Sequence, residues 1–480
     1  ELARRKALRL DTLHALEHGE GETAAIADLV STAVLHRHLQ TMLRLGIVYD
    51  FLPRESEILT LRFWDAARTL MIERGVLYLE TEGKNQGCWV MRRAGSQPGN
   101  VAAPDTPDVA APEAPAAAGT GPDEDAKVLV RSNGTVTYVG KDIAYHLWKF
   151  GLLPGKDFHY QPFFTYPAAA AAAGLAPAAT PAAAPAARTC WISTAGPNDP
   201  AAPAFGHADA IYNVIDSRQS DPQNNVVAAL RGMGFDSAAD RYTHLSYEMV
   251  AMTPRCAEDL GYTLSDADRQ RPFVEVSGRK GLGVKADDLI DRLVAAAQTE
   301  VDTRHPELPA AERTGIATQI AVGALRFFML RFARNTMIAF DFRDALSFEG
   351  ETGPYIQYAI VRARNIFRKA QAEEPHVLAA VAALDLTALD GEDTTVWETW
   401  LLASRLTAVL DQAIAAAEPA YLARYAFQMA QQFNNFYHRH HILTESDPTR
   451  RTLLLATAAM ARLQMSRALG WLGIEAPAVM

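Results

Sequence analysis

Apolar residues in the first part of the chain follow the spacing of helices and then of a strand. From His38 to Gly75 they recur every three or four positions, which predicts helical structure that ends at the glycine. From Val76 to Gly83 apolar and polar residues alternate, as in a half-buried strand. Residues 1–93 are therefore expected to mix helix and strand.

The middle of the chain predicts strands that alternate with helices. "KVLVRS" and "TVTYVG" are predicted strands around an Asn-Gly turn, and Asp142 opens a predicted helix. "AIYNVIDSRQ" is an apolar strand with a polar end, followed by a helix over 223–232 and a further strand candidate, "THLSYEMVAM". This alternation favours a parallel sheet, in which ligands bind at the carboxyl ends of strands. That position singles out Tyr138, Asp142 and Gln219.

The rest of the chain is predicted to be helical. After about Glu300 the strand signal fades, and apolar spacing of three and four continues to Met480. Two stretches rich in Ala and Pro, about 95–126 and 167–188, bury too little apolar surface to fold and are predicted to be disordered insertions. The expected fold class is α/β plus all-α.

Composition narrows the class of protein. The 480 residues carry a net charge of −10, which disfavours indiscriminate nucleic-acid binding but leaves room for a local basic patch. Three distant cysteines without a C-x-x-C pair indicate a reducing, cytoplasmic setting. No apolar run is long enough to span a bilayer, and no secretory signal is present.

A basic glycine-rich stretch, "VSGRKGLGVK" over 276–285, is the first candidate for chemistry. Its glycines allow close approach to a ligand, and Arg279, Lys280 and Lys285 suit phosphate charge. A P-loop is excluded, because Val284 stands where that motif needs lysine. The alternative is a surface loop before a helix.

Tyr138 and Asp142 form the second candidate. A carboxylate at a strand–helix junction can pair bidentately with a guanidinium group, and a tyrosine four residues earlier can stack on it or hydrogen-bond to it. The alternative makes Asp142 a helix N-cap and Tyr138 a core aromatic.

Two aromatic segments form the remaining candidates. Arginines recur among aromatics over 325–369, as in surfaces that hold single-stranded RNA; the alternative is an amphipathic helical core. "FNNFYHRHHIL" carries His438, His440 and His441 without a partnering carboxylate pattern, so no metal site is expected and a polar, RNA-facing rim at Tyr437 is favoured.

In this order, these segments resemble one family, arginyl-tRNA synthetase, a class I aminoacyl-tRNA synthetase. "TYVGKDIAY" resembles its arginine-binding segment, "VSGRKG" its variant of the K-M-S-K-S loop, and "FEGETGPYIQYAIVRAR" the start of its anticodon-binding domain. "AIYNVIDSRQ" and the final "WLGIEAPAVM" also match. The resemblance implies a Rossmann-like catalytic domain with a parallel sheet over 1–345 and a helical-bundle anticodon-binding domain over 346–480.

The resemblance also implies a reaction and a set of site residues. L-Arginine and ATP, with Mg²⁺, would form arginyl-adenylate, and the arginyl group would pass to tRNA(Arg), which must be bound for activation. No tightly bound cofactor is implied, and a monomer is expected. The implied roles are arginine binding by Tyr138, Asp142 and Gln219; catalysis by Ser277, Arg279 and Lys280; ATP binding by His244, Gly278 and Lys280; and anticodon contact by Tyr355, Gln357, Tyr358, Arg362, Tyr437 and Met480.

Two departures from the family pattern qualify this expectation. The loop has Val276, Ser277 and Gly278 where the common pattern has Met, Ser and Lys. The H-x-G-H motif of class I enzymes is absent from the sequence, as is the family's N-terminal RNA-binding domain. The chain, which begins at Glu1, is therefore predicted to be the C-terminal portion of a synthetase. The alternative is a non-catalytic tRNA-binding fragment or a synthetase-derived RNA-binding protein.

Overall fold

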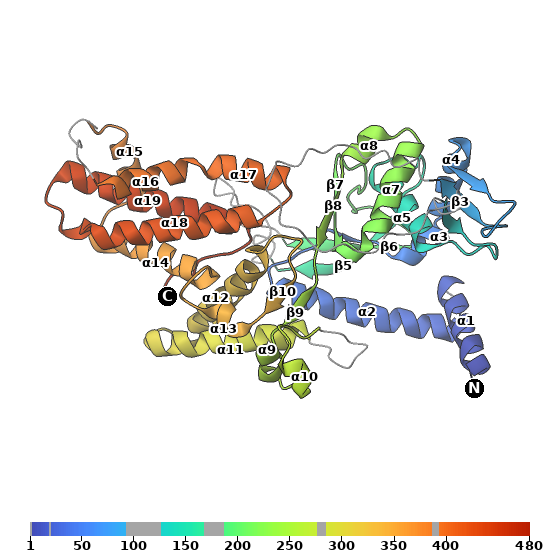
Figure 1. The fold of residues 1–480 in the computed structure, drawn as a ribbon, viewed down its shortest axis with the longest axis horizontal. Helices are drawn as coiled ribbons and strands as arrows, with labels where there is room; N and C mark the ends of the chain where they lie inside the picture. Colours follow the sequence, from blue (N-terminus) through green and yellow to red (C-terminus); the bar gives the residue numbers. More distant parts are fainter. Residues whose placement is uncertain (1, 19–20, 93–125, 168–186, 276–284, 386–392) are drawn as a thin grey trace. The chain divides into compact units, whose positions relative to one another are not determined.

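The computed structural model describes residues 2–18, 21–92, 126–167, 187–275, 285–385 and 393–480, which form two compact units (Figure 1). Unit 1 comprises Glu1–His36, Tyr49–Thr165 and Arg188–Ser246. Unit 2 comprises Arg37–Val48, Tyr166–Ala187 and Tyr247–Met480. Along the chain, the last change from one unit to the other falls at 246/247. The predicted boundary between the catalytic and the anticodon-binding domain, 345/346, divides the chain by function and stays a prediction. Both Ala/Pro-rich stretches lie almost entirely outside the described residues.

Unit 1 is a mixed α/β unit. Its elements in chain order are α1 (Leu2–His18), the first part of α2 (Gly21–Arg44), β1 (Phe51–Leu52), α3 (Glu55–Thr60), α4 (Phe63–Glu73), β2 (Leu77–Leu79), β3 (Trp89–Arg92), β4 (Ala126–Val130), α5 (Tyr138–Lys149), β5 (His159–Tyr166), β6 (Arg188–Thr194), β7 (Ile211–Asp216), η1 (Ser217–Gln219), α7 (Ser220–Gly232), α8 (Asp236–Asp240) and β8 (Tyr242–Tyr247).

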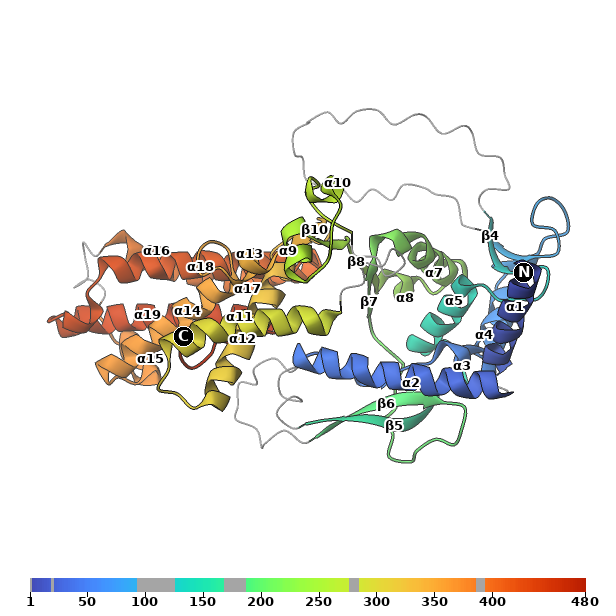
Figure 2. The same ribbon diagram turned by 90° about the horizontal axis from the view of Figure 1, so that it is seen from below.

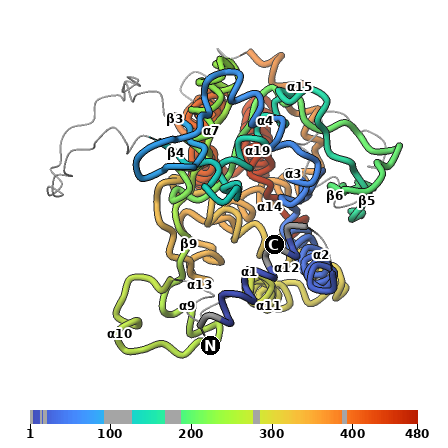
Figure 3. The backbone as a smooth tube through the Cα atoms, turned by 90° about the vertical axis from the view of Figure 1, so that its right-hand side faces the viewer, coloured from blue at the N-terminus to red at the C-terminus, as the bar shows by residue number. Residues whose placement is uncertain are grey.

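Short sheets organise this unit. β1 pairs with β6 in parallel, with Phe51 opposite Trp191, and β5 flanks β6. β2, β3 and β4 form an antiparallel sheet, whose strands β3 and β4 lie side by side in Figure 3. β7 and β8 form a separate pair. Helices α4, α5 and α7 pack around a core in which Phe63, Trp148 and Phe158 contact one another.

Two sequence-based assignments in unit 1 are wrong. The predicted helical stretch from His38 to Gly75 is broken after α2, because the chain turns at Gly46 in the left-handed region (φ 67°) and β1 joins a sheet with a strand some 140 residues away. "TVTYVG" is not a strand: only Val136 bridges to β4, and the helix starts at Tyr138 rather than Asp142.

Unit 2 is mainly helical. Its elements after β8 are β9 (Val250–Met252), α9 (Pro254–Asp259), α10 (Asp266–Arg269), α11 (Ala286–Arg304), α12 (Ala310–Leu330), β10 (Ile338–Phe340), α13 (Phe342–Leu346), α14 (Gly353–Ala370), α15 (Glu374–Val381), α16 (Thr394–Ser404), α17 (Leu406–Ala415), α18 (Ala420–Arg439), η4 (Ile442–Thr444) and α19 (Pro448–Trp471). Figure 2 shows α11 alongside α12, and these helices pack against each other.

The expected all-helical region has one exception and one well-filled core. β10 interrupts the helices and pairs in parallel with β9. Helices α14, α16, α18 and α19 enclose a core in which small and large side chains alternate, such as Ala426, Phe433 and Leu454. The parallel pairs β1/β6 and β9/β10, together with this helical assembly, confirm the predicted α/β plus all-α class.

The described residues contain neither a membrane-spanning helix nor a cluster of metal-binding side chains. Within those ranges, no helix has both the length and the apolar character needed to cross a membrane. In the same part of the chain, no group of three His, Cys, Asp or Glu side chains is arranged to hold a metal ion.

Candidate functional site

Tyr138 and Asp142 both lie on α5, four residues apart and therefore on one face of the helix. Thr137, not Asp142, occupies the N-cap position, so the capping alternative for Asp142 is excluded. The side chain of Tyr138 is 57% exposed, which excludes the core-aromatic alternative as well. The helix thus presents an accessible phenol one turn before a carboxyl group.

Asp142 is a half-buried carboxyl group whose pKa is raised to about 6. Burial is the main cause, and the negative charge of Glu55 adds to it, whereas Lys149 and Lys141 act in the opposite direction. Lys141 pairs instead with Glu55, with 3.0 Å between Nζ and Oε1. A carboxylate that has lost part of its hydration without gaining an ion-pair partner is a favourable binding point for a ligand cation.

Lys149 and His146 lie on the same polar face of α5, and neither was among the site residues predicted from the sequence. The Lys149 ammonium lies 4.3 Å from the centroid of the Tyr145 ring; burial lowers its pKa to about 8, against the influence of Asp142. His146 Nδ1 donates to the Asp142 carbonyl oxygen over 2.7 Å, and burial, reinforced by Lys149, lowers the pKa of the imidazole to about 3. The spacing 142, 146, 149 is a one-face helical pattern and could have revealed them.

Gln219 closes η1, directly after β7, and its side chain is exposed. One hydrogen bond connects the elements before and after the turn that carries Gln219: Asn213 Nδ2 on β7 donates to Gln223 Oε1 on α7 over 2.6 Å. The Tyr242 hydroxyl donates to the same Gln223 oxygen, and burial raises the pKa of that phenol to about 12. The Tyr242 ring also meets the His146 ring edge-on, 5.2 Å between centroids.

The predicted arginine-binding residues lie on neighbouring elements of unit 1. Helix α5, which carries Tyr138 and Asp142, packs against α7, which begins right after Gln219. His244, predicted to lie near ATP, is on β8, and its Nε2 donates to the Ile215 carbonyl oxygen over 3.1 Å. The predicted residues therefore come from neighbouring elements of one compact unit.

The predicted phosphate-binding residues Ser277, Gly278, Arg279 and Lys280 lie outside the described residues. Their flanks are held by contacts within unit 2. On one side, the backbones of Val274 and Met252 exchange hydrogen bonds of 2.8 and 3.2 Å. On the other, Asp287 in the first turn of α11 accepts from Thr41 over 2.7 Å and pairs with Arg44 over 2.5 Å.

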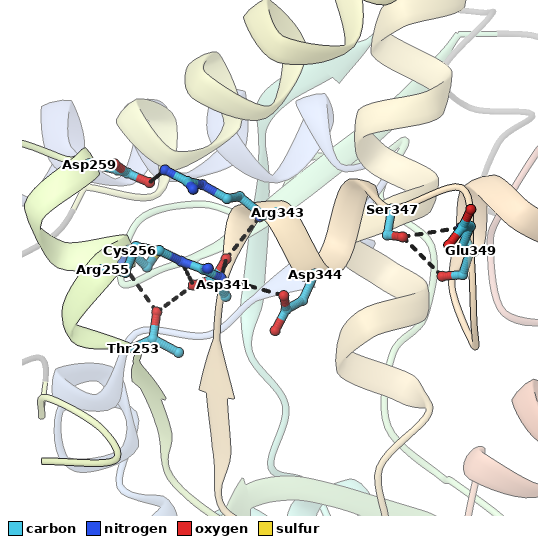
Figure 4. A network of polar contacts seen from close by, with 9 residues as sticks. All are labelled: Thr253, Arg255, Cys256, Asp259, Asp341, Arg343, Asp344, Ser347 and Glu349. Carbon is cyan, nitrogen blue, oxygen red and sulfur yellow. Dashed lines mark hydrogen bonds and ion pairs between the residues drawn. The ribbon is translucent and has the colours of Figure 1, made fainter.

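A buried carboxylate anchors the end of β9 to the end of β10 (Figure 4). Asp341 is 1% exposed and accepts from Thr253 Oγ1 over 2.6 Å, from Arg255 over 2.7 Å and from the Arg343 backbone over 2.9 Å. Burial alone would raise the pKa of Asp341, but the hydrogen bonds from Arg255 and Thr253 hold it below its usual range. Arg255 also reaches Asp344 at 3.4 Å. The network thus holds β9, the strand to which Val274 is hydrogen-bonded.

An aromatic and basic surface lies on α14 and α18 of unit 2. The Arg362 guanidinium lies over two rings, 4.8 Å from the centroid of Tyr358 and 5.2 Å from that of Tyr437. Arg362 also donates to Asn434 Oδ1 over 2.7 Å, and Asn434 Nδ2 donates to the Tyr355 hydroxyl over 2.9 Å. One chain of contacts thus connects four of the five predicted anticodon-contacting residues on these two helices, and Gln357 is the exception.

A cavity of about 210 Å³ opens at this surface. Of the residues that line it, two are cationic, Arg362 and Lys369, and none has an acidic side chain. The full lining is Tyr358, Arg362, Asn365, Ile366, Lys369, Tyr437, Leu443 and Met480. Aromatic faces, an amide and positive charge in one cavity suit a nucleobase with its phosphate. We call this feature the aromatic cavity.

Gln357 and His440 occupy different positions from those expected. Gln357 is fully buried, so direct contact between its side chain and RNA conflicts with the structure. It lies on the inner face of α14 because it is one residue away from the outward-facing Tyr358. His440 is also buried and bonds with Thr395 and Arg450, which is a structural role.

Comparison with known proteins defines first the class and then the family. Residues 356–480 match the family model of the DALR anticodon binding domain. This match identifies the class of protein as one with an anticodon-binding domain.

The chain is 33% identical to the arginine–tRNA ligase of Deinococcus radiodurans over 98% of its own length and 67% of that protein. It is 32% identical to the Pyrococcus abyssi enzyme of the same name and spans 63% of that protein's length. The solved Thermus thermophilus arginyl-tRNA synthetase matches 100% of this chain with a TM-score of 0.74 and 27% identity, over 67% of its own length. The chain belongs to the arginyl-tRNA synthetase family.

Proposed function

We propose that the chain carries out arginine–tRNA ligation, the ATP-dependent attachment of L-arginine to tRNA(Arg). Family membership gives the reaction class, and one observation carries the assignment to arginine. Asp142 is a half-buried carboxylate with a pKa raised to about 6, beside an exposed tyrosine on the same helix face. This arrangement selects a cationic side chain, and a planar guanidinium meets a carboxylate with two parallel hydrogen bonds.

The arginine substrate would be held by three side chains. Asp142 would accept from the guanidinium, Tyr138 would stack on it or hydrogen-bond to it, and Gln219 would contact it from the end of η1. The neutral imidazole of His146 supports this geometry because it binds the backbone carbonyl of Asp142. Lysine would fit worse, because its single ammonium cannot make the paired bonds.

The chemical steps follow from the proposed substrates. The arginine carboxylate attacks the α-phosphorus of ATP, and the bond to the bridging oxygen breaks, so that pyrophosphate leaves with its electrons. A hydroxyl of the terminal tRNA ribose then attacks the carbonyl carbon, loses its proton and displaces AMP. Ser277, Arg279 and Lys280 are proposed to stabilise the phosphate charge during the first step, with His244 and Gly278 beside the nucleotide, which would bring Mg²⁺ with it.

The tRNA would bind through the aromatic cavity. Unpaired anticodon bases stack on tyrosines and on a guanidinium plane, and Arg362 lies between Tyr358 and Tyr437 in that manner. Tyr355 supports the surface through Asn434. Met480 lines the cavity and is proposed to contact the anticodon together with these tyrosines.

The cellular setting and assembly state are part of the same proposal. Cys88, Cys190 and Cys256 are free thiols, which supports a reducing, cytoplasmic setting. A monomer is proposed, to be checked by light scattering at assay concentration.

The deciding experiment is pyrophosphate exchange into ATP, measured with each amino acid and with or without tRNA(Arg). The proposal expects exchange that requires both arginine and tRNA(Arg). Exchange that proceeds equally well with lysine would refute it. Tight, anticodon-dependent tRNA binding without any exchange would favour the alternative, an RNA-binding protein without catalysis.

A further inference from the structure

The segment Leu472–Met480, which follows α19, is held by side chains instead of by strand or helix pairing. Arg326 on α12 donates to the Leu472 carbonyl over 3.3 Å. Gln357 and Arg364 on α14 donate to the carbonyls of Glu475, Ala476 and Pro477, over 2.6, 3.2 and 2.8 Å. Because irregular backbone must find partners for its polar groups, these donors determine the path of the segment.

Gln357 is the central donor. Its amide nitrogen also donates to the Gln319 carbonyl on α12 over 3.1 Å, so one buried amide ties the segment to two helices. Gly323 makes room for it, since a Cβ at that position would lie 2.5 Å from the Gln357 nitrogen. At the start of the segment, Gly473 adopts a left-handed φ of 70°, and a Cβ there would overlap Arg326.

Packing and hydrogen bonds together hold this segment. A cavity of about 550 Å³ lies against it, lined among others by Gly323, Arg364, Gly473 and Glu475. Close apolar contact is missing where a cavity lies, so rigidity on that side must come from directional hydrogen bonds. Leu472, Ile474 and Pro477 are buried, and Val479 and Met480 pack against the core between α11, α12 and β10, so apolar contacts hold the segment on its other sides.

The far end of the segment forms part of the aromatic cavity. Met480 lines that cavity together with Tyr358, Arg362 and Tyr437. Met480 is the third residue after Pro477, whose carbonyl is held by Arg364, and three residues span about 10 Å at most. The position of the Met480 wall therefore depends on how residues 475–477 are held, in addition to the apolar contacts of Met480 itself.

We propose that Gln357 and Arg364 are positioning residues for RNA binding: they do not touch RNA but set the shape of the aromatic cavity through the segment Leu472–Met480. The inference rests on the proposed function, since it takes the anticodon loop of tRNA(Arg) as the ligand. It assigns to Gln357 an indirect role in place of the direct contact expected from the sequence.

The test compares Gln357→Met with a matched control, Gln464→Met. Gln464 on α19 also donates its amide to a carbonyl, and also has a buried oxygen without a partner, but its hydrogen bond goes to Ala403 on α16 and not to the segment. Both variants are expected to lower Tm. Only Gln357→Met is expected to weaken tRNA(Arg) binding, by about tenfold, and to reduce the Kd ratio between tRNA(Arg) and a transcript with an altered anticodon.

A double-mutant cycle with Met480→Ala identifies the route of the effect. If Gln357 acts through the Met480 wall, adding Met480→Ala to Gln357→Met weakens binding by less than the product of the two single effects. Multiplicative effects, or equal loss of binding in both glutamine variants, would overturn the inference. Should Gln357→Met fail to fold, Arg364→Met provides the same test, with the same expected outcomes.

The result also separates the inference from the function on which it rests. A wild-type chain that binds tRNA(Arg) no better than another tRNA would overturn the proposed function, and the inference with it. A wild-type chain that prefers tRNA(Arg), combined with an unchanged anticodon preference in folded Gln357→Met and Arg364→Met, would overturn the inference alone.

Discussion

Asp142→Asn removes the charge of the proposed arginine-binding carboxylate while keeping its shape. The rise of the Asp142 pKa from 3.8 to about 6 corresponds to ~3 kcal/mol of lost stabilisation of the charged form. Because the group still meets water at its rim, we discount this to ~2 kcal/mol. A bound guanidinium recovers at least that free energy, so the Kd for arginine is expected to rise about 30-fold or more in the variant.

The same substitution is expected to stabilise the fold. A carboxyl group whose folded pKa lies above its unfolded pKa holds its proton more tightly when folded. Its contribution to the free energy of unfolding therefore falls as the pH rises from about 4 through about 6. At pH 7 the charged Asp142 costs up to ~2 kcal/mol, and asparagine removes that cost. Tm should rise by several degrees while arginine binding is lost.

Calorimetric titration with arginine between pH 5 and pH 8 measures the effect directly. Wild-type affinity should fall about tenfold per pH unit below pH 6, since protonated Asp142 cannot pair with the guanidinium, and should level off above pH 7. The Asp142→Asn titration should be flat. Glu55→Gln is the matched control, because removing that negative charge should move the midpoint to lower pH. An Asp142→Asn variant with the wild-type slope would refute the reasoning.

Three further predictions concern unit 2. Tyr358→Ala should weaken tRNA(Arg) binding by about 1–3 kcal/mol in filter binding and leave the arginine Kd unchanged; equal loss of both would contradict the division of roles. Lys369→Met should weaken binding to all tRNAs alike and make the slope of log K against log salt shallower by about 0.7, as expected for one lost phosphate contact with single-stranded RNA; an unchanged slope would remove Lys369 from the interface. Arg255→Met should lower the free energy of unfolding by about 1–3 kcal/mol at pH 7, because it leaves the buried Asp341 carboxylate with fewer partners. The pKa of Asp341 is depressed, so in denaturant melts the difference in free energy of unfolding between the wild type and Arg255→Met should persist above pH 4. This difference should fade only as the pH falls below 3.8 and Asp341 takes up a proton.

Local spacing predicted the helical half of the chain and the strand of "AIYNVIDSRQ" well, because both depend on neighbours in sequence. It failed at β1, where two residues become a strand only by pairing with β6. It also failed at Tyr138, which looked like the end of a strand but starts α5. The β-branched and aromatic residues of this segment favour a strand locally, but packing of α5 against α4 and α7 stabilises a helix there instead.

The candidate site shows the same limit. Charge and position in the sequence led to Asp142, and the family resemblance led to Tyr358. The role of Gln357 depends on the Glu475 carbonyl, 118 positions away, and no periodicity reveals such a partner. Helical geometry alone could still have placed Gln357 on a different face of α14 from Tyr358.

The close crossing of α12 and α14 determines where this chain can be divided. A Cβ at Gly353 would lie 2.6 Å from the Gly323 carbonyl oxygen, and Phe327 of α12 belongs to the same core as Ile356 and Ile360 of α14. A fragment that starts at residue 356, where the family match begins, would therefore be cut through its own interior. An autonomous RNA-binding module, suitable for grafting onto another protein, would have to begin before Ala310 and carry α12 with it.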